Sequence, residues 1–284
     1  MKISRRNFLA VAGAAAAAAA LTACGGSSAS STSTASSAAA SSAAASGAAD
    51  GAEKIAKVAL TCDTGTIDDE SFNQACWAAV SSYMGDNCQY YIPDSDASDE
   101  DRETMIRQAV NDGADVIVCV GYLYGASLAW AAEQYPDIKF IAIDVTQGDI
   151  GTDSIPANCY CITFKEEQAG YLAGYAVVKD GYAYNPFITS AMKGLSESVS
   201  TALGDIEAGE WSNIAATNGN FGLEDGDYVG LPTADDSWNF KTFTKDEYEA
   251  LKSKIASGEL VVDNSSDDAT KPTVSEFTKV NYIQ

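Results

Sequence analysis

Short apolar runs alternate with longer amphipathic stretches along residues 57–181, and this alternation predicts a regular series of strands and helices. The apolar runs are nearly continuous, which is typical of strands buried on both faces of a parallel sheet. The predicted strands are 57–62 (KVALTC), 88–94 (CQYYIPD), 115–121 (DVIVCVG), 139–145 (KFIAIDV) and 158–164 (NCYCITF).

The stretches between these strands carry apolar residues at helical spacing. The predicted helices are 71–84, 98–113, 125–136 and 166–181. Ser71 and Gln74 match a capping box, and Ser98 followed by acidic residues begins the second helix. The repeated strand–helix order predicts an α/β fold, with a doubly wound parallel sheet covered by helices on both faces.

The pattern changes after Gly181. Helix-like stretches at 188–211 and 244–259 are mixed with a Gly/Asn/Asp-rich stretch at 217–227 and with strand-like runs at 228–232 and 259–263. This part has few strong strands, and we expect that it cannot build a second sheet of its own.

The first fifth of the chain has the composition of an export leader and a linker. Residues 1–24 combine a basic start, an apolar Ala-rich run and small residues before Cys24, which predicts a lipoprotein signal with a lipobox. An uncleaved anchor is the alternative, although the apolar run is shorter than the roughly 20 residues that a span needs. Arg5-Arg6 fits a twin-arginine signal or an ordinary basic leader. Residues 25–52 are a flexible Ser/Ala-rich linker.

Charge and composition exclude several function classes. The chain has 17 Lys and Arg against 40 Asp and Glu, a formal net charge of −23, so we expect no nucleic-acid partner. It contains no histidine, which removes Ser-His and Cys-His catalysis and the usual zinc sites. Residues 94–105 begin like a calcium loop but have Asp99 in place of Gly and Met105 in place of Glu. We predict no metal and no cofactor.

Six cysteines follow Cys24: 62, 76, 88, 119, 159 and 161. Four of them lie in apolar strand-like runs, where cysteine acts as a small buried hydrophobe. This favours free thiols, although disulfides are the common use of cysteine in exported proteins.

Polar groups follow three of the predicted strands. Asp63-Thr64-Gly65, Gly121-Tyr122 and Asp144 stand at the carboxyl ends, where ligands of doubly wound sheets bind. We therefore expect a binding site at this rim, while each residue alone is also compatible with a turn or cap role. A glycine-containing loop at 63–71 would suit phosphate, but its acidic residues oppose that ligand.

Several stretches resemble the basic membrane protein family, which comprises lipoprotein substrate-binding subunits of ABC importers with purine nucleosides as ligands. They are VALTCDTGTIDDESFNQACWAAV, DVIVCVGYLYG, KFIAIDV and EEQAGYLAGYAVVKDGY. The pattern D-x-G-x-x-D-D-x-S-F-N-x-x-x-W at 63–77 is specific for the family. The resemblance spans 57–182, resumes over 188–262, and implies a type-I periplasmic-binding-protein fold with ligand clamped between two lobes.

The resemblance also implies a set of ligand-binding residues, namely Asp63, Phe72, Asn73, Gly121, Asp144 and Lys193. Asp63 and Asp144 would accept hydrogen bonds from ribose hydroxyls, and Phe72 would stack on the purine with Asn73 beside it. Lys193 would be a polar contact from the returning segment. Carboxylates only accept hydrogen bonds, so the pair suits a neutral polyol and rejects phosphate.

By the same resemblance the second lobe is incomplete. The family continues after the helix near 179–182 into a second sheet with a further aromatic and a further aspartate, and about a hundred residues, the size of a lobe core, are absent here. An internal deletion, a sequence error and a natural variant all account for this. We expect the helices at 188–211 and 244–259 to leave their apolar faces exposed or to repack them on the first lobe.

We therefore predict four parts: a signal peptide (1–24) that ends in a lipidated Cys24, a linker (25–52), a first α/β lobe (53–182) and a remnant of the second lobe with a C-terminal helical segment (183–284). The predicted function is a lipid-anchored, extracytoplasmic substrate-binding protein that serves an ABC importer permease and takes a purine nucleoside. The alternative is a non-transporting remnant or surface interaction protein. An enzyme with Asp63, Asp68 and Asp69 as hydrolytic carboxylates is not favoured, because no histidine or second acidic motif accompanies them.

Overall fold

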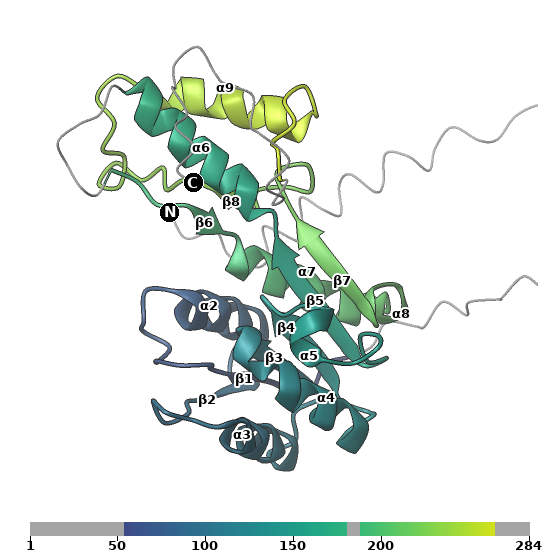
Figure 1. Cartoon of the computed structure of the whole chain (residues 1–284). Helices are drawn as coiled ribbons and strands as arrows, with labels where there is room; N and C mark the ends of the chain where they lie inside the picture. The colour runs from purple at the N-terminus through teal and green to yellow at the C-terminus, as the bar shows by residue number, and fades with distance from the viewer. Residues whose placement is uncertain (1–53, 181–187, 265–284) are drawn as a thin grey trace, which may run out of the picture. The chain divides into compact units, whose positions relative to one another are not determined.

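Five of the six strands in the central sheet come from the first part of the chain. The computed structural model describes residues 54–180 and 188–264, all within one of two compact units, residues 48–284. The strands are β1 (Val58–Thr61), β2 (Cys88–Tyr91), β3 (Val116–Val120), β4 (Lys139–Ile143), β5 (Cys159–Phe164) and β7 (Thr217–Phe221). Their order is β2-β1-β3-β4-β5-β7 and every neighbouring pair is parallel (Figure 1), which confirms the predicted α/β sheet.

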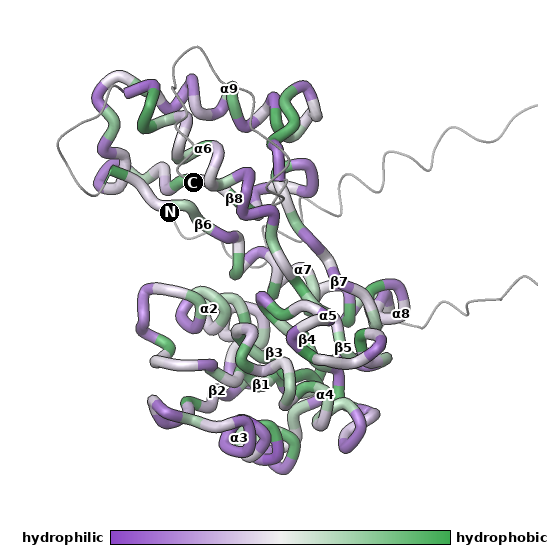
Figure 2. The backbone as a smooth tube through the Cα atoms, in the orientation of Figure 1, coloured by the Kyte–Doolittle hydropathy of each residue, from purple (hydrophilic) through white to green (hydrophobic). Residues whose placement is uncertain are grey.

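Helices cover both faces of this sheet. The elements of the first part are α2 (Phe72–Met84), α3 (Asp99–Asn111), η1 (Tyr122–Tyr124), α4 (Gly125–Gln134), α5 (Gln147–Ile150) and α6 (Glu166–Lys179). Alternate strand residues enter two cores: Leu60 and Val118 pack with α2, whereas Ile117 and Phe140 pack with α3 and α4. The central strands are strongly hydrophobic (Figure 2), so burial on both faces fixes the carboxyl ends in place.

The later part of the chain adds to the first sheet. Its elements are β6 (Met192–Lys193), α7 (Leu195–Glu207), α8 (Trp211–Ile214), β7, β8 (Val229–Gly230) and α9 (Lys245–Ala256). β7 pairs with β5 within the stretch that the sequence marked only as Gly/Asn/Asp-rich. The strand was missed because it lies at the edge and exposes polar residues such as Asn218 and Asn220.

The apolar faces of the later helices are covered. α7 packs against α2 and buries Val199 and Leu203, so of the two expected outcomes this helix repacks on the first lobe. α9 buries Tyr248, Leu251 and Ile255 and lies against α6. The expectation that this part forms no sheet of its own is wrong on a small scale, because β6 and β8 form a two-stranded antiparallel sheet.

Three local predictions are also wrong. The predicted helix over 188–211 is divided into β6 and α7, and only its last residue belongs to α8. Residues 259–263 form no strand, and Val261 is 84% exposed. Ser71 makes no capping box, because Asp69 instead accepts hydrogen bonds from the backbone amides of Ser71 (2.8 Å) and Gln74 (3.1 Å). A carboxylate just before the helix thus takes the capping role.

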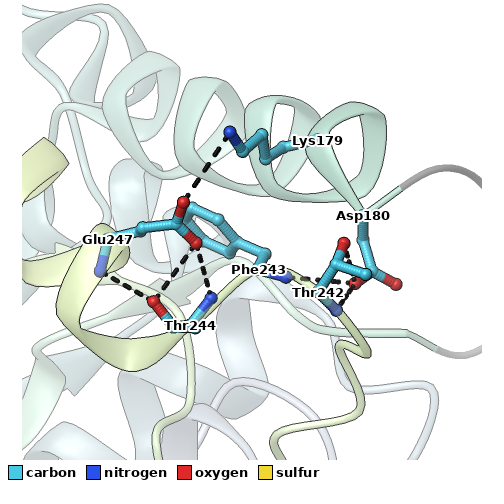
Figure 3. Close-up of polar contacts among 6 residues, drawn as sticks. All are labelled: Lys179, Asp180, Thr242, Phe243, Thr244 and Glu247. Carbon is cyan, nitrogen blue, oxygen red and sulfur yellow. Dashed lines mark hydrogen bonds and ion pairs between the residues drawn. The ribbon is translucent and has the colours of Figure 1, made fainter.

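A buried carboxylate fastens α9 to the end of α6 (Figure 3). Asp180 Oδ1 accepts hydrogen bonds from the backbone amides of Lys241 (2.6 Å), Thr242 and Phe243 (3.2 Å), and from the Thr242 hydroxyl. Thr244 and Glu247 form the capping box that begins α9. The segment before α9 is therefore held by one acidic side chain.

The six cysteines among the described residues are all free, and five of them are buried. Cys159 and Cys161 lie on the same face of β5, in the core under α3 and α4. The expectation of buried free thiols is confirmed for all but Cys88, which is partly exposed. The predicted signal and linker lie outside the described residues, and no helix within the described part is long and apolar enough to cross a membrane.

Candidate functional site

The carboxyl ends of β1 and β3 bring Asp63 against Gly121. Gly121 has a φ of +91°, and a Cβ placed on it would lie 2.5 Å from Asp63 Oδ2. The amide of Gly121 donates a hydrogen bond of 2.8 Å to the carbonyl of Ile143, and Ile143 is the residue before Asp144. Three of the predicted residues therefore stand at one rim, because three neighbouring strands end there.

Asn73 braces the loop that carries Asp63. Its side chain is 1% exposed, and Nδ2 donates to the carbonyl of Thr64 (2.7 Å), to Asp69 Oδ2 (2.9 Å) and, more weakly, to Asp63 Oδ1 (3.4 Å). Asn73 Oδ1 is buried without a partner. The amide group thus positions Asp63, and its oxygen remains available to accept a hydrogen bond.

One of the acidic residues of this loop, Asp69, makes its hydrogen bonds within the loop and the start of α2. Burial alone would raise the pKa of Asp69, but hydrogen bonds from Gln74, Ser71 and Asn73 outweigh it and the pKa is lowered. Asp69 therefore stays ionised as a cap and as a brace for Asn73. Among the carboxylates of the loop, Asp63 is the one that lies against Gly121 at the rim.

Lys193 and Asp144 form the other half of the site. Asp144 follows β4 in a left-handed conformation (φ +60°), and both of its oxygens accept from Lys193 Nζ, at 2.9 and 2.8 Å. Lys193 also pairs with Glu166 at 2.6 Å. Burial alone would lower the pKa of Lys193, but hydrogen bonds to these two carboxylates outweigh it and raise the pKa, so the ammonium stays charged.

Aromatic rings complete this half. The ammonium of Lys193 lies 5.1 Å from the ring centroid of Phe72 and 5.8 Å from that of Phe164. Both distances fall within the range of cation–π attraction. The structure therefore links Phe72, at the start of α2, to the Lys193–Asp144 pair.

The six predicted site residues therefore form two groups of contacts at this rim: Asp63 with Asn73 and Gly121, and Lys193 with Asp144 and Phe72. The two groups are linked through Ile143, which accepts from Gly121 and precedes Asp144. Sequence reasoning missed Glu166 and Phe164. The available signal was their place at the carboxyl end of β5, beside that of β4. Of the predicted residues, Lys193 also lines a cavity of about 240 Å³ beside β6, β8 and α9.

The arrangement has the chemistry of a binding site. It offers carboxylate acceptors beside an aromatic ring, and no group of three His, Cys, Asp or Glu in the described ranges is arranged to hold a metal ion. Such groups bind a ligand that donates several hydrogen bonds and presents a flat apolar face.

Residues 55–180 match the Bmp family, described as PnrA-like ABC transporter substrate-binding proteins. This match covers less than half of the chain and shows that residues 55–180 are similar to the Bmp family. An uncharacterized lipoprotein of Pyrococcus abyssi is 33% identical over 135 residues, which are 46% of this chain and 31% of that protein. Basic membrane protein A of Borreliella burgdorferi is 30% identical over 126 residues, which are 44% of this chain and 36% of that protein.

The chain thus spans about a third of the length of these curated relatives. An ABC transporter solute-binding protein from Conexibacter woesei matches the fold with a TM-score of 0.57 at 17% identity, over 73% of this chain and 98% of that one. A solute-binding protein from Aeropyrum pernix gives a TM-score of 0.52 at 16% identity, over 74% of this chain and 94% of that one.

These findings confirm the predicted resemblance to this family and the predicted α/β fold, and the matched family is one of ABC transporter substrate-binding proteins. Residues 2–22 match a twin-arginine translocation signal, which favours that interpretation of Arg5-Arg6. With the lipoprotein relatives, this match indicates an exported, membrane-associated protein.

Proposed function

We propose that the chain is the lipid-anchored, extracytoplasmic substrate-binding protein of an ABC importer and that its ligand is a purine nucleoside. The observation that carries the proposal is the convergence of Asp63, Asp144 and Phe72 at one sheet rim. Two carboxylates suit the hydroxyls of a ribose, and one aromatic ring suits the face of a base. The family match supports the import role.

The selectivity of such a site follows from its charge. Asp63 and Asp144 accept hydrogen bonds and repel phosphate, so nucleosides are expected to bind and nucleotides are not. Purines present a larger stacking face than pyrimidines, so guanosine or inosine is expected to bind more tightly than uridine.

The test is calorimetric titration of the chain from residue 24 onward, with Cys24→Ser to prevent lipidation. Guanosine, inosine, adenosine, uridine and guanosine monophosphate are titrated after the sample gives a cooperative thermal melt. Micromolar binding of a purine nucleoside, with weaker uridine and no nucleotide binding, supports the proposal. Phe72→Ala should weaken binding by roughly 5- to 100-fold through lost stacking, whereas Tyr90→Ala on the edge strand β2 should not.

A second candidate is a folded remnant that no longer binds nucleosides. It is favoured by the extent of the match, because the 135 aligned residues cover only 31% of the Pyrococcus abyssi lipoprotein. A cooperative melt without heat from any nucleoside would support this candidate and would exclude the nucleoside ligand.

Anchoring is tested separately in cells. Lipid on Cys24 predicts that the wild-type protein fractionates with membranes and that Cys24→Ser moves it to the soluble extracytoplasmic fraction. Membrane retention of Cys24→Ser would show that another segment anchors the chain.

A further inference from the structure

The carbonyl of Cys62 stands directly before Asp63, and the ladder between β1 and β2 cannot provide a donor for it. The amide of Cys62 donates to the carbonyl of Tyr91 at 3.0 Å, which continues the parallel ladder between the two strands. The next bond of this ladder would run from the amide of residue 93 to the carbonyl of Cys62. Residue 93 is a proline, which has no N–H, so the ladder stops here.

The hydroxyl of Tyr124 supplies the missing donor. It donates to the carbonyl of Cys62 at 2.9 Å, and Tyr124 is fully buried. Tyr124 ends η1, the short turn after β3, and its amide donates to the carbonyl of Gly121 at 3.1 Å. A side chain from the turn after β3 therefore replaces a backbone donor at the end of β1, where a buried carbonyl without a partner would be costly.

The core under α3 and α4 holds the Tyr124 side chain in place. The ring packs in this core, and the guanidinium carbon of Arg102, a residue only 5% exposed, lies 6.0 Å from its centroid. Burial raises the pKa of Tyr124 well above its ordinary value, so the hydroxyl keeps its proton and can donate.

Asp63 is held on its other sides by groups that lie at the rim. A Cβ at Gly121 would lie 2.5 Å from Asp63 Oδ2. Asn73 Nδ2 donates to the carbonyl of Thr64 at 2.7 Å, and the amide of Thr64 donates to Asp63 Oδ1. The Tyr124 hydroxyl fixes the peptide on the remaining, N-terminal side. Because Tyr124 is fully buried, it acts on a ligand only through Asp63.

We propose that Tyr124 is a positioning residue: its hydroxyl replaces the amide donor that Pro93 lacks and thereby sets the position of the Asp63 carboxylate. This inference rests on the proposed function, in which Asp63 accepts hydrogen bonds from the ligand. Without the hydroxyl, the buried carbonyl of Cys62 lacks a partner, and the peptide that leads into Asp63 turns to find one. The carboxylate is then displaced from its place beside Gly121.

The first experiment reads the position of Asp63 by NMR without ligand, on the chain from residue 24 onward with Cys24→Ser. Tyr124→Phe removes one oxygen and keeps the ring, so the ring-current shifts of neighbouring nuclei change little. The signals of the Thr64 backbone amide and the Asn73 side-chain amide should move, because both groups donate to Asp63. Signals that stay in place would overturn the proposal.

Tyr91→Phe is the matched control. Tyr91 belongs to the same core as Tyr124, and its hydroxyl donates to Asp112 at 2.7 Å. Its substitution removes a hydrogen-bonded hydroxyl and leaves the backbone bond to Cys62 in place. The signals of Thr64 and Asn73 should not move. Equal shifts in both variants would show a general response to the loss of a core hydroxyl and would overturn the specific role of Tyr124.

The second experiment restores the donor. Pro93→Ala gives residue 93 an N–H, and in the Tyr124→Phe background it should return the Thr64 and Asn73 signals toward their wild-type positions and raise the Tm. If Tyr124→Phe alone does not fold, recovery of a cooperative melt in the double variant tests the same bond. No recovery would overturn the replacement of the Pro93 donor by the hydroxyl.

The third experiment is calorimetric titration with guanosine. Tyr124→Phe should raise the Kd about tenfold, the equivalent of one hydrogen bond that the displaced carboxylate no longer makes. Tyr91→Phe should leave the Kd unchanged. An unchanged Kd in Tyr124→Phe would overturn the positioning role. If the wild-type chain binds no nucleoside, the proposed ligand is wrong, and the NMR shifts alone decide whether Tyr124 positions Asp63.

Discussion

At the residue scale, the approach of Asp63 to Gly121 depends on the missing side chain of the glycine. A Cβ at Gly121 would lie 2.5 Å from Asp63 Oδ2, and the residue has a φ of +91°. Gly121→Ala should therefore lower the free energy of unfolding by about 2–3 kcal/mol, since left-handed strain and a steric clash act together. It should also displace Asp63 and weaken nucleoside binding. Urea unfolding and calorimetry measure the two effects.

Gly85→Ala is the control for that substitution. Gly85 also has a positive φ, +61°, but a Cβ at this residue would have nothing within 4 Å. Gly85→Ala should lower the free energy of unfolding by about 1 kcal/mol through backbone strain alone, and it should leave ligand binding unchanged. Equal losses of unfolding free energy for the two glycine variants would mean that the close approach of Asp63 to Gly121 does not contribute to the loss.

The sequence predicted only part of the site at this scale. Asp63, Gly121 and Asp144 were predictable because each follows a buried strand, and the carboxyl ends of neighbouring parallel strands meet. The contacts of Lys193 with Glu166 and Phe164 were not, because they depend on where β6 lies. No periodicity places a two-residue strand.

At the element scale, Asp180 joins the end of α6 to the beginning of α9 through a single carboxylate oxygen (Figure 3). Asp180→Asn keeps the shape but removes the charge that four donors share. We expect a loss of about 2 kcal/mol in urea unfolding, the usual range for hydrogen bonds to a charged group. Asp246→Asn, at an exposed position in the first turn of α9, removes the same charge and should cost much less. Comparable losses of unfolding free energy in the two variants would show that Asp180 does not hold α6 and α9 together.

A second junction predicts acid sensitivity. Lys165 and Gln168, at the start of α6, bind Glu224 in the loop after β7. Burial alone would raise the pKa of Glu224, but the hydrogen bonds from Lys165 and Gln168 outweigh it and lower the pKa to about 2. A carboxylate whose pKa is lowered by folding stabilises the fold at any pH above its pKa in the unfolded chain. This stabilisation is lost as the pH falls from about 4.5 toward 2.

Glu224→Gln should therefore show a smaller fall in Tm than the wild-type chain between about pH 5 and pH 2.5. Glu133→Gln, at an exposed position of α4, should follow the wild-type curve. A Glu224→Gln curve parallel to the wild type would show that the pairing with Lys165 does not contribute to acid sensitivity.

Elements with strong apolar patterns were predictable, and those that depend on partners were not. β1, β3, β4 and β5 were predicted from continuous apolar runs. β7 was not, because its polar residues face solvent and its pairing with β5 supplies the strand. Residues 259–263 have the opposite property: an apolar run without a neighbouring strand stays irregular.

At the scale of the whole molecule, the returning segment is part of the same fold as the first lobe. The sequence left open whether α7 would be exposed, because the resemblance assigns its usual partner to an absent sheet. The structure packs it against α2, and β7 extends the sheet on the far side of β5. The partner of an amphipathic helix is a tertiary property, so its pattern could not identify α2 in advance.

This integration predicts that damage to α7 destabilises the first lobe as well. Leu203 is fully buried between α7 and the core under α2. Leu203→Ala should cost about 2–5 kcal/mol through lost burial and a cavity. Val261→Ala removes similar apolar groups at a position that is 84% exposed, and it should change stability by less than about 0.5 kcal/mol.

The decisive measurement is the coincidence of two probes in urea. Trp77, Trp211 and Trp238 are replaced by Phe, so that Trp130 is the only tryptophan. Circular dichroism then follows the unfolding of all helices. The fluorescence of Trp130 follows only α4, on the opposite face of the sheet from α7. If the chain unfolds as one unit, Leu203→Ala lowers the urea midpoint by the same amount for both probes. The dependence of the free energy of unfolding on urea concentration stays unchanged. A fluorescence midpoint that stays in place while the circular dichroism midpoint falls would mean that α7 unfolds alone, and that the first lobe stands without the returning segment.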